Sequence, residues 1–257
     1  MSLFYDDLVS RSLLEMSTFL KLKRNTFLGD LLEPTGVTIC WLSEKSSFDE
    51  LINSCVVEKN KQAFLAGNSR LGTRCEICPE DNSLTTPPIL QKHRGRSIIS
   101  LDCTGLQKWD ALGFLYRLSL LSKEPTPIVV IDNITAIPRV GQAVEDPVVV
   151  ENWLLHSWHN DSIQLVEKSG IPFTLHPQDF TVLIPILKED GSNINLSRLR
   201  NDCFGQLEFE ESLKRWTETD FCEVYQYYAR IGRITRGQET EINEYLKTHP
   251  ENPSSVR

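Results

Sequence analysis

The chain has 257 residues, of which 40% are hydrophobic and 24% are charged, and its formal net charge is −8. The length is enough for one large α/β domain or for one domain with a small appendage, and the composition is ordinary for a soluble globular protein. The negative charge argues against binding of duplex DNA or anionic membranes through bulk charge. It has no apolar run of membrane-spanning length and no signal-peptide pattern, so we expect a cytoplasmic protein.

The first part of the chain predicts a helix, a strand and a second helix. From residue 3 to about residue 23, apolar residues recur at helical spacing, which predicts an amphipathic helix that packs on its own domain or on a partner. Residues 1–34 are therefore expected to form this helix and a linker. The apolar run 37–42 predicts a buried strand, residues 43–47 a polar turn, and the residues from Phe48 onward a helix.

Residues 67–96 are rich in glycine and proline, and we expect them to be an insertion or exposed loop. Six basic residues in this loop indicate either a solvated segment or a contact for nucleic acid: Arg70, Arg74, Lys92, His93, Arg94 and Arg96. The loop also contains the CxxC pair Cys75 and Cys78. Because the sequence has no second CxxC, an incidental surface pair is favoured over redox chemistry or a zinc site, and zinc stays an open alternative.

The later segments alternate between strands and helices. Strands are predicted at residues 97–103, 126–132 and 180–187, and helices at residues 109–121 and 147–159. Residues 213–248 are expected to form a small C-terminal helical segment, and residues 249–257 a disordered tail.

This alternation predicts an α/β protein, a three-layer α/β/α sandwich whose central sheet is mostly parallel and lies within residues 35–212. Residues 128–131 are apolar on every side chain, as in a strand buried on both faces, and they lead into Asp132. We expect the strands that end at Leu42 and Ile131 to lie side by side, with their polar ends at one edge of the sheet, where α/β proteins bind ligands.

The stretch Ser43-Glu44-Lys45-Ser46-Ser47 follows the first strand, and with the order of elements over residues 37–210 it resembles a P-loop nucleotide hydrolase of the AAA+ family. The resemblance implies that this stretch binds nucleotide, with Lys45 at the β- and γ-phosphates of ATP and Ser46 at Mg²⁺. The turn lacks the glycines of GxxxxGK[ST], is shorter, and carries the negative Glu44. The alternative is a degenerate turn with Lys45 in solvent.

The resemblance also assigns roles to later residues. Asp132-Asn133 stands at the position of the acidic pair, so Asp132 would hold Mg²⁺ and Asn133 replaces the general base. An aspartate that caps a turn is the alternative for Asp132. Residues 195–204 look similar to the segment that bears the family's arginine finger, with Arg198 or Arg200 as the candidate, unless both pair with local acids. The short C-terminal part implies a truncated helical lid.

Together these features predict a divergent AAA+-like protein with weak or lost ATP hydrolysis, which acts as a subunit or regulator of an assembly. Clamp-loader and helicase-loader-like proteins are the precedent, so a link to DNA is open. A protein partner or a homo-oligomer is expected, without a membrane. One alternative is an active ATPase with an unorthodox phosphate loop. The other is a module without nucleotide that contacts protein or nucleic acid through residues 67–96.

Overall fold

The computed structural model describes residues 2–56, 62–66, 69–79, 85–104, 108–121, 125–134, 163–166, 170, 172–175, 177–190 and 204–231. The chain divides into two compact units. The first, called here the helical unit, comprises Met1–Leu31, Pro79–His93 and Glu211–Arg257. The second, the sheet unit, comprises Leu32–Cys78 and Arg94–Glu210.

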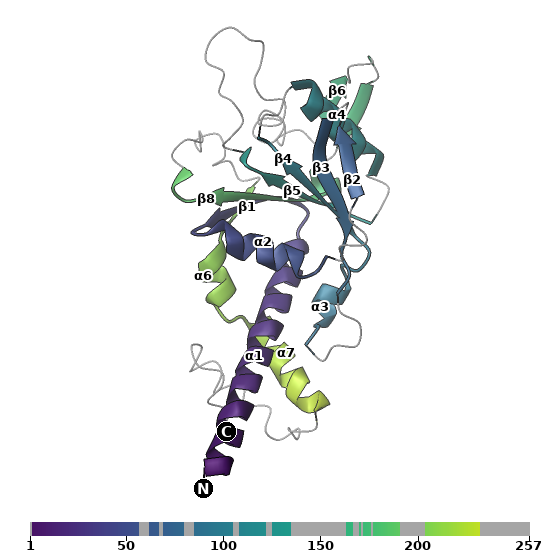
Figure 1. Cartoon of the computed structure of the whole chain (residues 1–257). Helices are drawn as coiled ribbons and strands as arrows, with labels where there is room; N and C mark the ends of the chain where they lie inside the picture. Colours follow the sequence, from purple (N-terminus) through teal and green to yellow (C-terminus); the bar gives the residue numbers. More distant parts are fainter. Residues whose placement is uncertain are drawn as a thin grey trace. The chain divides into compact units, whose positions relative to one another are not determined.

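A seven-stranded sheet forms the centre of the sheet unit (Figure 1), with strand order β2-β3-β4-β5-β8-β1-β9. The strands are β1 (Gly36–Leu42), β2 (Gln62–Ala66), β3 (Ser69–Glu76), β4 (Ser97–Asp102), β5 (Ile128–Asp132), β8 (Thr181–Leu187) and β9 (Phe204–Glu208). From β4 to β9 all neighbours are parallel, whereas β3 is antiparallel to both β2 and β4. The expected mostly parallel α/β sheet is therefore confirmed.

The central strands are buried because their side chains are apolar on both faces. The first four residues of β5 are all buried, and so are the first six of β8. Alternate side chains of a strand point to opposite faces, so such runs require cover on both sides of the sheet. This explains why the sequence pattern located β1, β4, β5 and β8 to within two residues at either end.

Helices α2 (Lys45–Asn53) and α4 (Lys108–Leu121) lie on opposite sides of the sheet in Figure 1. Helix α2 contacts β8, and α4 contacts β2 and β3. A separate antiparallel pair, β6 (Ile163–Val166) and β7 (Pro172–Leu175), contacts α4 through β7. A short 3-10 helix (Pro177–Asp179) leads into β8.

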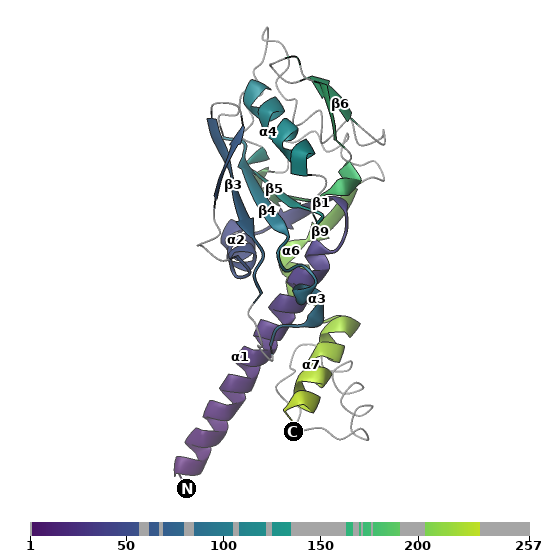
Figure 2. The ribbon, with the colours of Figure 1, turned by 90° about the vertical axis from the view of Figure 1, so that its right-hand side faces the viewer.

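The structure differs from two expectations about the sheet. Residues 69–76 are not part of an irregular loop, because they form β3, which pairs with β4 and lies next to it in Figure 2. The strands that end at Leu42 and Ile131 share one sheet and one direction, but they are not neighbours: β8 lies between them. Strand order is a long-range property that local periodicity does not encode.

A buried arginine ties together the amino ends of the parallel strands. Arg96, directly before β4, is 8% exposed, and its guanidinium donates hydrogen bonds to the carbonyl oxygens of Leu32 (2.8 Å) and Thr126 (2.6 Å) and to Oγ1 of Thr181 (3.0 Å). Thr181 in turn donates to the carbonyl of Pro34 at 2.8 Å. Burial lowers the pKa of Arg96, an effect that Glu33 opposes, but a guanidinium stays charged at neutral pH.

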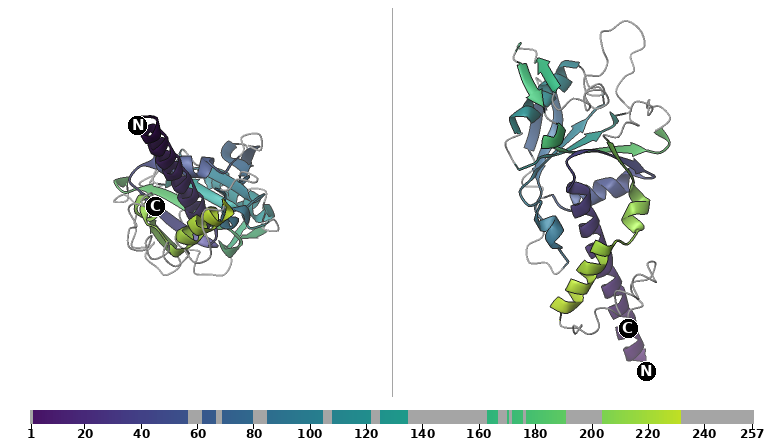
Figure 3. Two further views of the ribbon diagram at one scale, coloured as in Figure 1. Left: turned by 90° about the horizontal axis from the view of Figure 1, so that it is seen from below. Right: turned by 180° about the vertical axis from the view of Figure 1, so that it is seen from behind.

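The helical unit contains α1 (Ser2–Leu32), α3 (Pro88–Gln91) and α7 (Glu218–Arg230). Helix α1 continues to Leu32, nine residues beyond the expected end at Lys23. Figure 3 shows α7 beside α1, and Phe19, Leu22 and Val224 form a buried cluster there, against which Trp216 and Tyr227 pack. The short helix α6 (Phe209–Lys214) follows β9 without a break.

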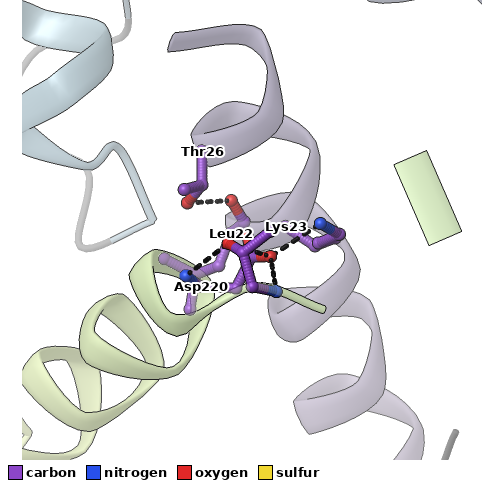
Figure 4. A network of polar contacts seen from close by, with 5 residues as sticks. Leu22, Lys23, Thr26 and Asp220 are labelled. Carbon is purple, nitrogen blue, oxygen red and sulfur yellow. Dashed lines mark hydrogen bonds and ion pairs between the residues drawn. The ribbon is translucent and has the colours of Figure 1, made fainter. Parts of the chain in front are cut away.

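One buried ion pair joins α1 to α7. Lys23 Nζ lies 2.6 Å from Asp220 Oδ2, and the two side chains are 5% and 1% exposed (Figure 4). The same Asp220 oxygen accepts hydrogen bonds from the backbone N–H (2.7 Å) and hydroxyl (2.9 Å) of Thr217, which completes the capping box of α7. Replacing either charged partner alone would leave a buried charge, so this contact fixes how α7 pairs with α1.

Among the helices of the described segments, none combines the length and the apolar character needed to cross a membrane. The expected helix at residues 147–159 and the expected disordered tail at 249–257 lie outside the described residues. Of the expected C-terminal helical segment, α6 from residue 213 and α7 are described.

Candidate functional site

The candidate site lies at the carboxyl ends of β1, β5 and β4, which share one edge of the sheet because these strands are parallel. The ladder between β5 and β8 covers only Ile128, Val129 and Val130. Thr181 donates its N–H toward β5, to the carbonyl of Pro127 at 3.0 Å. Since alternate residues of a strand donate to the same side, position 185 would also donate toward β5, but it is a proline.

The end of β5 is therefore released from β8 and available to other partners. Lys45, the first residue of α2, contacts the end of β5: its Nζ lies 2.5 Å from Oδ2 of Asp132. The two side chains are 34% and 26% exposed, so solvent screens the pair in part. The ammonium and the carboxylate that the resemblance assigns to phosphate and Mg²⁺ are in direct contact, and Lys45 is not free in solvent.

A carboxylate from the residues that follow β9, the neighbour of β1 in the sheet, binds the turn between β1 and α2. Glu210 Oε1 accepts hydrogen bonds from the backbone N–H groups of Ser43 (2.8 Å) and Glu44 (3.0 Å). Partial burial would raise the pKa of Glu210, but these hydrogen bonds outweigh it and lower the pKa below its ordinary value. Glu210 is therefore an anion bound to the turn at neutral pH.

The hydroxyl of Ser46, which the resemblance assigns to Mg²⁺, has a partner within the turn. The hydroxyl of Ser46 donates to Oε1 of Glu44, and both residues are exposed. Glu44 is the N-cap residue of α2, yet its side chain makes no capping hydrogen bond. Ser47 lies in the first turn of α2.

Asn133 has a left-handed backbone, with φ of 53°, which asparagine tolerates better than most residues. Its Nδ2 donates to Oδ1 of Asp102 at 2.9 Å, and the same oxygen accepts the N–H of Thr104, also at 2.9 Å. Partial burial raises the pKa of Asp102, but these hydrogen bonds outweigh it and lower the pKa. The side chains that end β4 and β5 are thus linked, and Asp102 is a weaker base than an ordinary aspartate.

The surroundings of Lys45 are strongly acidic. Burial raises the pKa of Asp49 on α2, while Lys45 lowers it and Asp132 adds to the rise. The thiol of Cys103, which follows β4, is buried, and burial raises its pKa to about 12, with the charges of Asp102 and Asp132 adding to the effect. Such a thiol is not ionised at neutral pH and does not act as a nucleophile there.

The basic residues expected on an exposed loop are distributed differently in the structure. Arg96 and His93 are buried, the latter with Nε2 3.1 Å from the carbonyl oxygen of Gly29, and Arg74 donates to the hydroxyl of Ser97. Of the CxxC pair, Cys75 is buried and Cys78 is half-buried, so the pair does not lie wholly on the surface. In the described segments, no group of three or more potential ligands is arranged to hold a metal ion.

Two candidate residues, Arg198 and Arg200, lie outside the described residues. Sequence reasoning missed Asp102 and Glu210. Asp102 had the same signal as Asp132, an acid at the end of an apolar strand, and that rule would have found it. Glu210 had no local signal, because its role depends on contact with a turn that is 166 residues away in the chain.

Comparison with known proteins adds no further assignment. No protein-family model matches this chain, and no curated protein matches its sequence.

Proposed function

We propose that the chain is a divergent P-loop NTPase-like protein of AAA+ type that hydrolyses ATP weakly or not at all and acts as a subunit or regulator of an assembly. In this proposal the sheet with α2 and α4 is the remnant of a three-layer α/β/α nucleotide-binding domain. The sheet edge at Lys45 and Asp132 is the former nucleotide site.

The strand order supports the proposed ancestry. The resemblance gives the phosphate loop to β1 and the acidic pair to β5, and these strands run parallel in one sheet with only β8 between them. The two residues that would act on the phosphates and on Mg²⁺ are Lys45 at the start of α2 and Asp132 at the end of β5, and their charged atoms lie 2.5 Å apart. An arrangement of this kind is what a nucleotide site at the carboxyl edge of an α/β sheet requires.

The observation that carries the proposal of weak hydrolysis is the state of Asn133. An amide cannot take a proton from an attacking water, and this amide donates its N–H to Asp102. The neighbouring carboxylate of Asp102 does not substitute for it well, because its pKa is lowered. The site therefore has a cation and a Mg²⁺-type ligand, while neither Asn133 nor Asp102 is an effective general base.

Charge also works against a bound triphosphate. Around the turn, the ammonium of Lys45 is accompanied by the carboxylates of Asp132 and Asp102, while the backbone N–H groups of Ser43 and Glu44 already bind Glu210. A triphosphate needs donors and positive charge at this place. We therefore expect weak binding of Mg-ATP at best.

The test is a nucleotide assay on the full chain. We expect Mg-ATP to cause no thermal shift beyond that of Mg²⁺ alone, and phosphate release to stay at background and to be the same in Lys45→Ala and Asp132→Ala. In light scattering we expect self-association or complex formation with a partner. A clear thermal shift, together with phosphate release that either substitution abolishes, would refute the proposal.

That result would instead identify the second candidate, an active ATPase with an unorthodox loop. The observation that favours this candidate is the contact between Lys45 and Asp132, since an active site would need the same two groups close together. Asn133→Ala separates the candidates further. An ATPase that uses Asn133 to position water loses activity in this variant, whereas a protein without hydrolysis shows no change.

A further inference from the structure

The carboxylate of Glu210 has the contacts of a bound anion. One oxygen accepts two consecutive backbone N–H groups, those of Ser43 and Glu44, at 2.8 and 3.0 Å. These donors lead directly into α2, a helix of nine residues. Consecutive N–H groups that converge at a helix N-terminus form a concave anion site, and such sites bind phosphate in nucleotide-binding proteins.

The second oxygen of Glu210 gives an independent observation. Glu210 Oε2 is buried and has no hydrogen-bond partner among the described residues, although the Glu210 side chain as a whole is only half-buried. A buried acceptor without a donor costs free energy, and the cost is larger for a charged group. Capping of α2 does not by itself require Glu210 at this place. The N-cap residue Glu44 has a carboxylate of its own, which makes no capping hydrogen bond and instead accepts one from Ser46.

An aromatic contact holds Glu210 in this place. The preceding residue, Phe209, is fully buried, and its ring packs edge-to-face on Phe48 of α2, with ring centroids 5.4 Å apart and an angle of 60° between the planes. Such pairs add stability beyond the area they bury. Phe48 lies in α2, and Glu210 binds the N-terminus of the same helix. The contact between Phe48 and Phe209 therefore keeps Glu210, the next residue, close to that N-terminus.

We propose that Glu210 is a built-in anion that closes the β1–α2 turn against phosphate, an autoinhibitory contact within the sheet unit. The inference rests on the proposed function, because it takes the turn to be a former phosphate loop. In this view Glu210 keeps the N–H groups of Ser43 and Glu44 from binding phosphate. It follows that the turn still provides phosphate-binding geometry, which becomes accessible when the carboxylate is removed.

The experiment uses the full chain and inorganic pyrophosphate as the probe, in buffer without Mg²⁺ and at matched ionic strength. Glu210→Ala removes the carboxylate, and Glu210→Gln keeps its size while removing its charge. Glu211→Ala, at the exposed neighbouring position on α6, is the matched control. Binding is measured by calorimetry, and its place is determined from the amide NMR signals of Ser43 and Glu44.

We expect no saturable binding of pyrophosphate to wild type or Glu211→Ala. Affinity should be at least about tenfold higher in Glu210→Ala, which corresponds to about 1.4 kcal/mol. A smaller gain is expected in Glu210→Gln, because its neutral amide oxygen can still accept the N–H groups of Ser43 and Glu44. The signals of Ser43 and Glu44 should shift in both Glu210 variants on titration.

The inference is overturned if no folded Glu210 variant binds pyrophosphate more tightly than wild type, or if Glu211→Ala gains as much. If Glu210→Ala does not fold, Glu210→Gln decides the question by the same criterion. Failure here does not affect the proposed loss of hydrolysis. ATP hydrolysis by wild type would refute the proposed function instead, and the two results are therefore distinguishable.

Discussion

Lys45 and Arg96 are two basic residues of the sheet unit with different surroundings. Lys45 is about one-third exposed and pairs with a single carboxylate, that of Asp132. Arg96 is buried and donates to main-chain carbonyls and a hydroxyl at the opposite ends of the strands. Solvent screens the first contact and leaves the second at nearly full strength, so similar substitutions at the two positions should have very different costs.

For the pair of Lys45 and Asp132 we predict a small coupling energy. In a double-mutant cycle with Lys45→Ala and Asp132→Ala, the coupling in the free energy of unfolding should be about 1 kcal/mol or less, because both side chains are partly solvated. Urea denaturation of the four proteins measures it. A coupling of several kcal/mol would mean that the pair behaves as a buried ion pair.

For Arg96 we predict a large effect. Arg96→Met removes three hydrogen bonds and leaves the buried carbonyl oxygen of Leu32 and the half-buried one of Thr126 without this donor, which should lower the free energy of unfolding by about 3 kcal/mol or more. Arg117→Met on α4 is the control, since Arg117 is exposed and should change stability by about 0.5 kcal/mol or less. Similar denaturation midpoints for the two variants would contradict the assigned role of Arg96.

At the scale of elements, the approach of α3 to α1 within the helical unit depends on a glycine. A Cβ at Gly29 would lie 2.8 Å from Cγ2 of Ile89, closer than real Cβ atoms approach, and 3.2 Å from the backbone carbon of Ile89, which is a tight contact. Isoleucine is restricted at χ1, so its side chain cannot easily turn away. The helix propensity of alanine, about 1 kcal/mol better than glycine, therefore competes with a steric clash.

We predict that the clash dominates in Gly29→Ala. The variant should be less stable than wild type by about 1–3 kcal/mol, despite its better helix propensity. Adding Ile89→Ala should remove the clash, so the double variant should lose less stability than the sum of the single changes. Thermal denaturation of the three variants checks this, and a Gly29→Ala protein more stable than wild type would show that α3 moves away without cost.

At the scale of the whole molecule, burial raises the pKa of carboxyl groups and hydrogen bonds from N–H groups lower it. In the helical unit, burial raises the pKa of Glu223, although Arg230 opposes the effect. In the sheet unit, hydrogen bonds from the turn outweigh burial and lower the pKa of Glu210. The folded protein therefore binds a proton at Glu223 more readily, and at Glu210 less readily, than the unfolded chain does.

The resulting pH dependence has opposite signs at the two sites. A raised pKa of Glu223 means that stability falls as pH rises from the ordinary glutamate value through the folded-state value, so Glu223→Gln should be more stable than wild type at pH 7 and equal to it below about pH 4. Glu210→Gln is the matched comparison: it should be less stable than wild type at pH 7, and the difference should shrink as pH falls. Urea denaturation from pH 3 to 7 measures both.

The sequence by itself determined the elements whose signal is local. The apolar runs of β1, β4, β5 and β8 and the helical spacing of α4 were predicted because a buried strand or helix face leaves its period in neighbouring residues. The identity of Asn133 likewise sufficed to predict that its side chain cannot serve as a general base, since no fold gives an amide the basicity of a carboxylate.

Only the tertiary structure decided what depends on residues far apart in the chain. It placed β8 between β1 and β5, made a strand of residues 69–76 and buried Arg96, against the expectation of an exposed basic loop. It also brought Glu210 to the N–H groups of Ser43 and Glu44. The physical reason is that strand pairing and carboxylate capping satisfy hydrogen bonds between distant segments, and such contacts leave no periodic pattern in either segment alone.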